Sequence, residues 1–334
     1  MNTDSPFHQA FKRFKKNGPA LAGVVFIAFL ILVALGGAAI RPDSSRDANN
    51  QHLSIARQKP GFQVDIIHLT DGSEVPISHF EQKDGEVLYT PFGETADRAI
   101  SADDADFKVE HRRYLLGTDK YGRDLLSRLM AGTGLSLSVG FIAVLISLLL
   151  GIVLGACAGY FGGKTDAVIS WVINVVWSIP TLLMVIAITL AFGKGFWQVF
   201  VAVGLTMWVE VARVVRGQFL SIREKEYVEA AKMLGLSNFR IMYRHILPNA
   251  SGPIIVISAA NFASAILIEA GLSFLGIGAQ IPTPSWGNMI KEHYALITTD
   301  LAYLAILPGL LIMLLVLSFM MIGNGLRDAL DVRS

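Results

Sequence analysis

Apolar residues are gathered into long blocks along this chain rather than spaced on one face of short amphipathic helices. The five clearest blocks cover 18–40, 129–163, 167–193, 246–268 and 301–326. A run of about 18 or more residues without charge is typical of a membrane-spanning helix, because the hydrocarbon core of a bilayer is about 30 Å thick. The pattern therefore predicts an all-α polytopic membrane protein.

A sixth, weaker block begins at residue 195 and is interrupted by Glu210. Arg213 follows on the same helical face, so the two charges could satisfy one another within a span that continues to about residue 215. The sequence thus predicts six membrane-spanning helices, at about 18–40, 135–158, 167–192, 195–215, 250–276 and 301–325.

Composition agrees with this prediction, since 53% of the residues are hydrophobic and only 16% are charged. The first block could instead be a signal peptide, because basic residues precede it and small residues end it. Its apolar run exceeds the roughly 7–15 residues of such segments, which favours a retained helix. The single cysteine, Cys157, excludes an internal disulfide and a cysteine metal cluster, and we expect no metal site.

Basic residues in the short flanking segments predict the orientation, because they are retained on the cytoplasmic side. Four of them precede the first span, namely Lys12, Arg13, Lys15 and Lys16. Six more lie between the fourth and fifth spans, namely Arg216, Arg223, Lys225, Lys232, Arg240 and Arg244. We therefore expect a cytoplasmic N-terminus (1–17), a cytoplasmic loop (216–249), a cytoplasmic C-terminus (327–334) and an extracytoplasmic insert (41–128).

The insert alternates apolar and polar residues between positions 61 and 93. Asp-Gly pairs at 71–72 and 84–85 are typical of tight hairpin turns, so the pattern predicts a three-stranded β-meander. The four histidines of the insert fit no compact ligand spacing and are expected to be ordinary side chains, namely His52, His68, His79 and His111. A docking or gating role and a passive insertion are equally compatible with the sequence.

The segment after the fourth block predicts a helix, a turn and a second helix between residues 221 and 248. Gly235 stands where a left-handed residue would end the first helix, and Ser237 could cap the second. Leu236 and Ile241 are spaced to form a hydrophobic staple, and Pro248 is expected to stop the second helix. Such a rigid elbow could insert into a groove on a partner or lie on the membrane surface.

The elbow also resembles a known family. Glu229, Ala230 and Ala231, followed by Gly235 and then by Leu247 and Pro248, are similar to the EAA loop of ABC importer permeases. The resemblance implies that this loop docks in a cleft of the ATP-binding subunit, with small alanines that permit close approach and Gly235 at the turn. His245 stands where that family has isoleucine, a departure in the second half of the motif.

Further motifs resemble the dipeptide, oligopeptide and nickel permeases of the OppC/DppC type. One precedes the second span and includes Gly117, Thr118, Asp119, Gly122, Arg123 and Asp124. Others follow the fifth span, at 269–276 and 282–287. The resemblance implies the type I ABC importer permease fold. The insert at about 41–114 is longer than this family leads us to expect.

The resemblance implies the permease of an ATP-driven importer in the bacterial inner membrane, which forms half of a pathway for peptides. Its partners would be a homologous second permease, two ATP-binding subunits, an extracytoplasmic solute-binding protein and membrane lipid, but no nucleic acid. ATP and Mg²⁺ would be used by the ATPase partners, since this chain has no phosphate-binding loop and is not an enzyme. Nickel chelates or another small solute are an alternative cargo.

A secondary transporter driven by ions is the alternative class, and it would need paired charges within several spans. Only Glu269 lies deep in an apolar block. Glu269 could serve the pathway or a subunit interface, or could be a structural hydrogen-bonded carboxylate. Pro180 is expected to kink the third span.

Two further features of the spans have structural interpretations. Gly151, Gly155 and Gly159 are spaced for close helix packing, within the subunit or across a dimer. Asp119, Arg123 and Asp124 are best explained as a capped turn held by charge pairing.

Overall fold

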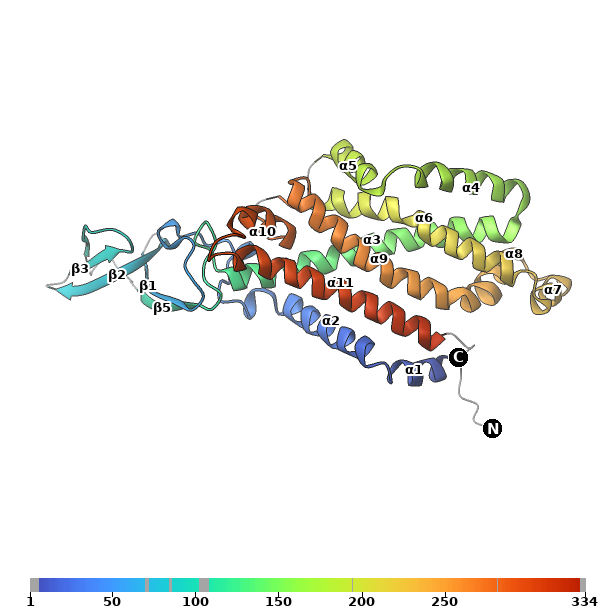
Figure 1. The fold of residues 1–334 in the computed structure, drawn as a ribbon, viewed down its shortest axis with the longest axis horizontal. Helices are drawn as coiled ribbons and strands as arrows, with labels where there is room; N and C mark the ends of the chain where they lie inside the picture. The colour runs from blue at the N-terminus through green and yellow to red at the C-terminus, as the bar shows by residue number, and fades with distance from the viewer. Residues whose placement is uncertain are drawn as a thin grey trace.

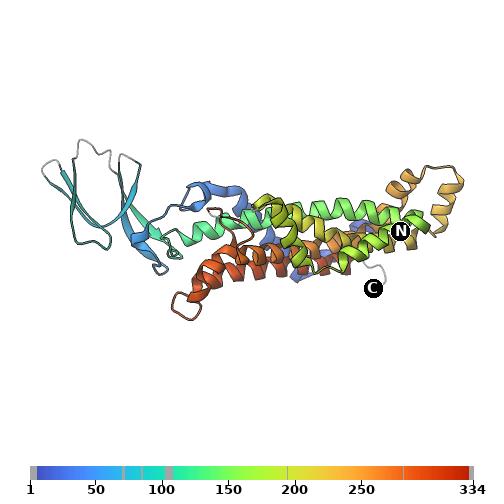
Figure 2. The same cartoon turned by 90° about the horizontal axis from the view of Figure 1, so that it is seen from above.

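The computed structural model describes residues 6–69, 72–83, 86–101, 108–193, 195–280 and 282–330. The molecule is elongated: a bundle of long helices carries a β-sheet at one end and the short helix α7 at the other (Figures 1 and 2). The helices are α1 (Pro6–Phe14), α2 (Gly18–Gly36), α3 (Leu125–Phe161), α4 (Gly163–Trp177), α5 (Thr181–Phe192), α6 (Phe196–Ile222), α7 (Glu226–Met233), α8 (Asn238–Ile241), α9 (Leu247–Leu275), α10 (Trp286–His293) and α11 (Tyr303–Leu330). Short 3-10 turns lie at Gly37–Ala39, Arg46–Ala48, Leu53–Ile55 and Tyr294–Leu296.

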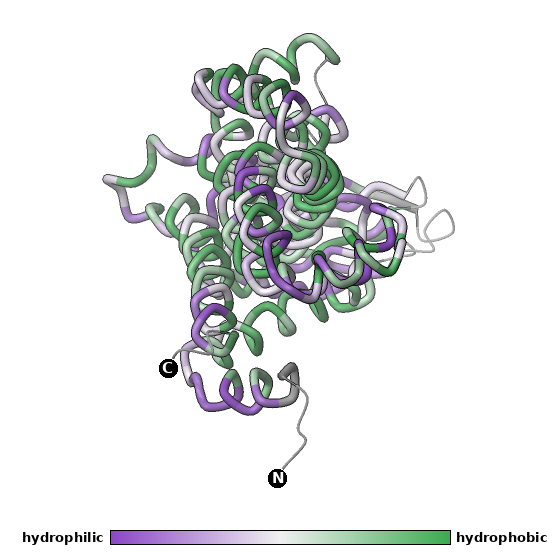
Figure 3. Tube along the Cα trace, turned by 90° about the vertical axis from the view of Figure 1, so that its right-hand side faces the viewer, coloured by the Kyte–Doolittle hydropathy of each residue, from purple (hydrophilic) through white to green (hydrophobic). Residues whose placement is uncertain are grey.

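Within the described ranges, five continuous helical segments are long and apolar enough to cross a membrane. They are Gly18–Ala39, Leu125–Phe161, Trp197–Ile222, Asn238–Leu275 and Tyr303–Leu330. Hydrophobic residues predominate along the helices of the bundle, and hydrophilic residues stand out next to the N-terminus (Figure 3). Several helices extend beyond the predicted spans because a charge-free run marks only the part of a helix that can lie in hydrocarbon.

The predicted third span is not one straight helix. Its residues form α4 and α5, which meet at 89° across a short break at 178–180. Pro180 stands immediately before α5 with φ −54°, and its ring nitrogen cannot donate the hydrogen bond that would continue α4. The expected kink is therefore a full break, and the pair is either one broken span or a re-entrant segment.

The predicted end of the elbow at Pro248 is wrong. Residues Asn238–Ile241 continue through a π-helical turn at Met242–Ile246 directly into α9. Pro248 follows the π-helical turn directly and lies in the first turn of α9, so it does not end the helix. The second half of the elbow is thus continuous with a membrane-spanning helix.

The parallel helices α3 and α6 pack closely along a stripe of glycines. A Cβ built at Gly151 would lie 2.5 Å from Val211, and one at Gly159 would lie 2.6 Å from Phe219. Gly155 faces Ala212 in the same way. The predicted small-residue packing therefore occurs within this subunit, where the absence of side chains lets the two backbones approach.

The insert folds as an antiparallel sheet of five strands in the order β4-β3-β2-β1-β5. The strands are β1 (Phe62–His68), β2 (Glu74–Lys83), β3 (Glu86–Pro91), β4 (Arg98–Ser101) and β5 (Lys108–Tyr114). The three predicted strands are present, and the sequence analysis missed β4 and β5. Asp71, Asp84 and Gly85 of the predicted turns lie outside the described residues, whereas Gly72 has φ +80°.

Charged side chains of the sheet gather around Glu74. Arg112 Nη1 donates to Glu74 at 2.9 Å, and His52 Nε2 lies 3.4 Å from the same carboxylate. The His52 ring and Arg112 lower the pKa of Glu74 to about 2, against the opposing effect of burial. His68 lies 3.1 Å from Glu110, and His111 lies 2.7 Å from Asp65. These three histidines therefore face carboxylates, in line with the expected ordinary roles.

Candidate functional site

The elbow between α6 and α9 is a rigid turn built by local backbone chemistry. Gly235 has φ +76°, its amide donates to the Lys232 carbonyl, and the Leu236 amide donates to the Ala231 carbonyl. These two bonds make a Schellman ending for α7. Ser237 has the extended backbone of an N-cap residue, but its side chain makes no capping hydrogen bond. The predicted role of Gly235 in the turn is confirmed, and the predicted cap is wrong.

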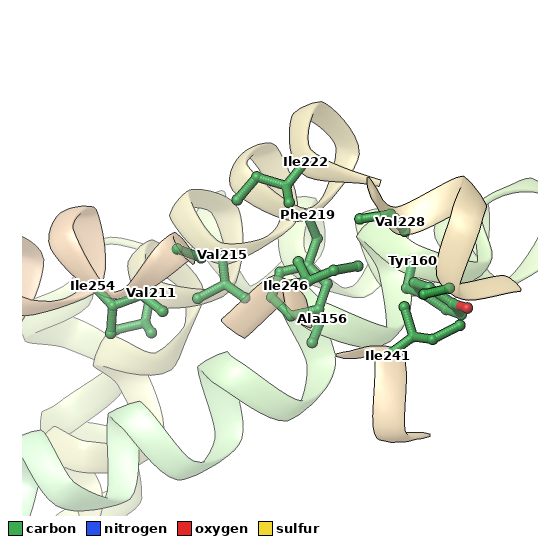
Figure 4. Packing of buried hydrophobic residues seen from close by; sticks show 12 residues of the cluster. Ala156, Tyr160, Val211, Val215, Phe219, Ile222, Val228, Ile241, Ile246 and Ile254 are labelled. Carbon is green, nitrogen blue, oxygen red and sulfur yellow. The ribbon is translucent and has the colours of Figure 1, made fainter. Parts of the chain in front are cut away.

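A hydrophobic cluster fastens the elbow to the ends of α3, α6 and α9 (Figure 4). Val228 and Ala231 of α7 and Ile241 of α8 are buried in it together with Tyr160 and Phe219. Leu236 packs against the same cluster, as the predicted staple with Ile241 requires. Because these side chains are buried, α7 and α8 are held to three membrane-spanning helices by apolar packing.

Polar contacts add to this attachment. Tyr160 Oη donates to Asn238 Oδ1 at 2.9 Å, which joins the end of α3 to the start of α8. Arg223 Nη1 donates to the Gly159 carbonyl at 3.0 Å and so ties the end of α6 to α3. Arg216 forms a two-point ion pair with Asp166 of α4. The elbow is therefore positioned relative to the bundle by directional bonds as well as by packing.

The two motif alanines have different environments. Ala230 and Glu229 are exposed, whereas Ala231 is only 5% exposed and belongs to the cluster under the elbow. Ala231 therefore packs within the chain itself, and the expectation that the small alanines allow close approach of a partner stays a prediction. Leu247 packs against the same cluster, and Pro248 lies exposed at the start of α9.

Large apolar side chains project from the tip of the elbow. Met233 is 89% exposed, Leu234 80% and Phe239 77%, and the rings of Phe239 and Tyr243 stack with centroids 6.2 Å apart. We call Met233, Leu234, Phe239 and Tyr243 the apolar tip. Exposed apolar residues gathered on one short element are typical of a protein interaction site. The sequence analysis missed these residues, although Met233 and Leu234 adjoin Gly235.

The turn before α3 lies at the opposite end of the bundle and is densely bonded. Asp119 accepts from the amides of Tyr121 and Arg123, and Arg123 Nη2 donates to Glu292 at 2.9 Å. Asp124 caps α3 by accepting from the Ser127 amide, and burial raises its pKa. The charge-paired, capped turn predicted from the sequence is confirmed.

The glycines and the threonine of this turn allow it to lie directly against the segment at 52–58. A Cβ at Gly117 or Gly122 would collide with the carbonyl oxygen of Gln58 or His52. Thr118 Oγ1 donates to the Ile55 carbonyl and accepts from the Gln58 amide at 2.8 Å. These bonds join the turn to the segment that leads into the sheet.

Asp119, Glu292 and His293 bring three ligand-type atoms within 4.8 Å of one another. Arg123 bonds to both carboxylates, and His293 Nδ1 lies 2.8 Å from the Met289 carbonyl. Burial lowers the pKa of His293. The acidic charges of the cluster are thus compensated by an arginine, and the expectation of no metal stays a prediction.

Glu269 is buried near the end of α9. Its Oε1 accepts from Ser273 Oγ at 2.7 Å and from Ser285 Oγ at 2.8 Å, while Oε2 has no hydrogen-bond partner in the described part of the chain. Ser285 immediately precedes α10, a helix that the sequence analysis missed. The carboxyl group therefore links α9 to α10, as in the predicted structural role, and its role in a pathway or subunit interface stays a prediction.

Comparisons with known proteins point to one family. Residues 147–333 match the model for the binding-protein-dependent transport system inner membrane component. Residues 5–60 match the N-terminal transmembrane domain of oligopeptide transport permease C. In fold alone, the chain is also similar to a solved inward-facing structure of the MetNI methionine ABC transporter, with a TM-score of 0.52 at 18% identity, covering 62% of this chain and 98% of that one.

Named relatives cover two thirds of the chain or more. The dipeptide transport system permease protein DppC of Alkalihalophilus pseudofirmus is 34% identical, and the alignment covers 98% of this chain and 90% of that protein. The oligopeptide transport system permease protein OppC of Bacillus subtilis is 36% identical, with 67% and 73% covered. Together with the helical bundle and its elbow, these matches show that the chain belongs to the family of binding-protein-dependent transport system inner membrane components.

Proposed function

We propose that this chain is the permease subunit of an ATP-driven peptide importer and that the apolar tip of the elbow docks in a partner ATPase. The observation that carries the proposal is an exposed apolar surface on a rigid element that is fixed to three membrane-spanning helices. A helix that presents apolar anchors to a groove is a common mode of protein recognition. The relatives named above, with dipeptides and oligopeptides in their names, support peptides as the cargo.

The elbow end of the bundle would face the cytoplasm. Lys12, Lys15 and Lys16 flank the first span, and the described chain ends lie at the same end of the molecule as α7 (Figures 1 and 2). Retention of basic flanks on the cytoplasmic side supports this orientation. The sheet would then lie outside the membrane, where a solute-binding protein delivers the peptide.

Coupling would follow from the way the elbow is attached. When ATP closes the ATPase dimer, a displacement of α7 and α8 would pass through the buried cluster to α3, α6 and α9. The continuous path from α8 through the π-turn into α9 supports a rigid connection. A homologous second permease would complete the pathway, and ATP with Mg²⁺ would be bound by the partner ATPases rather than by this chain.

Co-purification of the ATPase subunits tests this proposal. We expect Met233→Asp and Phe239→Asp to reduce retention of the ATPase at least about ten-fold, because each would place an unpaired charge in an apolar contact. Leu53→Asp is the matched control, since Leu53 is 71% exposed and lies in the segment that leads into the sheet, at the opposite end of the molecule. Full ATPase retention by both tip variants would contradict the proposal.

A further inference from the structure

Two hollows border both α6 and α9: the first is otherwise lined by α1 and α11, and the second by the region where α4 meets α5. The one at the elbow end has a volume of about 910 Å³ and includes Val214, and the second has about 320 Å³ and includes Glu210. On α9 the first hollow is lined by Pro248, Asn249, Ser251, Gly252, Pro253, Val256, Ile257 and Ala260, and the second by Ser264, Leu267 and Ile268. Val214 and Glu210 on α6, and Ala260 and Ser264 on α9, are each four residues apart on one helical face. The two hollows therefore follow one another along these helices, and we call them together the α6–α9 groove.

Glu210 lies in the middle of this groove. It is about 20 Å from either end of α6 at 1.5 Å per residue, and its side chain is exposed. Among the described residues no cation lies within 4.0 Å of it, so the predicted pair with Arg213 is not formed. Arg213 instead lies 3.8 Å above the ring of Trp177. A carboxylate at this depth is costly unless it faces water or a cation.

Hydroxyl groups from three helices share the second hollow with Glu210. They belong to Thr181 of α5, Thr206 of α6 and Ser264 of α9. Thr206 Oγ1 donates its hydrogen to the Val203 carbonyl at 2.9 Å, so its oxygen remains free to accept. An ammonium group carries three donors and no acceptor, and it therefore matches a carboxylate surrounded by accepting oxygens.

We propose that the α6–α9 groove is the substrate-facing surface of the chain and that Glu210 binds the terminal ammonium group of a passing peptide. The inference rests on the proposed import function and adds a binding residue to it. Leu267 and Ile268 offer apolar surface beside the carboxylate, and 320 Å³ lies in the roughly 300–1,000 Å³ range of small-ligand sites. Charge complementarity favours a cationic peptide terminus over a lipid chain.

Thiol labelling in the assembled importer, reconstituted in lipid vesicles, tests access to the groove. Cys157, the single cysteine of the sequence, is replaced by alanine, and Ser264→Cys introduces a thiol beside Glu210. We expect a small water-soluble thiol reagent to label this variant. Trialanine should slow labelling about ten-fold, corresponding to about 1.4 kcal/mol, and N-acetyl-trialanine should not. An unreactive thiol, or equal protection by both peptides, would overturn the proposal.

Uptake measurements test the carboxylate itself. Glu210→Gln removes the charge at nearly constant volume and should raise the KM for trialanine about ten-fold, whereas Glu210→Asp should raise it less. Glu81→Gln, at an exposed position on β2, is the matched control and should transport normally. Unchanged uptake by Glu210→Gln would refute the role. If the second permease no longer co-purified with the Glu210→Gln variant, the carboxylate would belong to the subunit interface, which would also refute its role in peptide binding.

Failure of this inference is distinguishable from failure of the proposed function. Trialanine uptake and ATPase retention by the unsubstituted complex are measured first, and neither depends on the Glu210 variants. A complex that imports trialanine but is insensitive to Glu210→Gln would leave the import function standing. A complex that imports no peptide would remove the basis of both.

Discussion

Replacement of Gly235 by alanine isolates the contribution of one backbone conformation to the elbow. Gly235 has φ +76°, and a Cβ built there meets no atom within 4 Å. The substitution therefore introduces no collision, and its cost arises from the left-handed backbone alone. That cost is about 1–2 kcal/mol for a residue with a Cβ.

Hydrogen exchange reports this cost directly, because α7 can open locally without unfolding of the whole bundle. A loss of about 1–2 kcal/mol corresponds to amide exchange in α7 that is about 5–30 times faster. Gly235→Asn should accelerate exchange less, since asparagine tolerates the left-handed conformation better than alanine does. Exchange in α3 and α11 should not change.

Gly217→Ala is the matched control. Gly217 also has open space around a built Cβ, but it lies inside α6 with no positive φ. Alanine should therefore be neutral or slightly stabilising there. Unchanged exchange of α7 in Gly235→Ala, or equal effects of alanine and asparagine at this position, would refute the reasoning.

Three further predictions concern other parts of the molecule. Gly155→Leu should destabilise the protein in detergent by about 1–3 kcal/mol, because a Cβ there would lie 2.5 Å from the Ala212 carbonyl. Gly134→Ala should not, because its Cβ would meet only the Ala34 Cβ at 4.0 Å, an ordinary contact. Arg123→Met should lower the free energy of unfolding by about 3–5 kcal/mol, because the buried Asp119 loses its nearest cation and keeps only Arg128 at 3.8 Å. Asp119→Asn in the same chain should recover part of this loss in thermal unfolding. Because the pKa of Glu74 is lower in the folded protein than in the unfolded chain, the ionised carboxylate stabilises the fold above pH 4.5. In thermal unfolding, stability should therefore fall as the pH is lowered from 4.5 towards 2, and it should fall less in Glu74→Gln.

Local chemistry made part of this structure predictable. The charge-free blocks located the apolar helices because the hydrocarbon core imposes a minimum length on them. Gly235 was predictable because few other residues adopt a left-handed backbone, and Asp124 because a carboxylate satisfies the free amides at a helix start. Each signal depends on residues that are adjacent in sequence.

The remaining features depend on contacts between distant segments. Pro180 predicts a kink but not the 89° angle between α4 and α5, and β5 pairs with β1, forty or more residues earlier in the sequence. The inward position of Ala231 follows from contact with the ends of α3 and α6, which its motif does not encode. The apolar tip was missed because an apolar residue in sequence is normally expected to be buried.

The central claim is that a partner ATPase covers the apolar tip. Its most direct test is the maleimide labelling rate of Met233→Cys and Phe239→Cys in a Cys157→Ala background, with and without the ATPase subunits, and with Leu53→Cys as the control. We predict that the ATPase slows labelling at both tip positions about ten-fold and leaves position 53 unchanged. Unchanged labelling at the tip while the ATPase remains bound would contradict the claim.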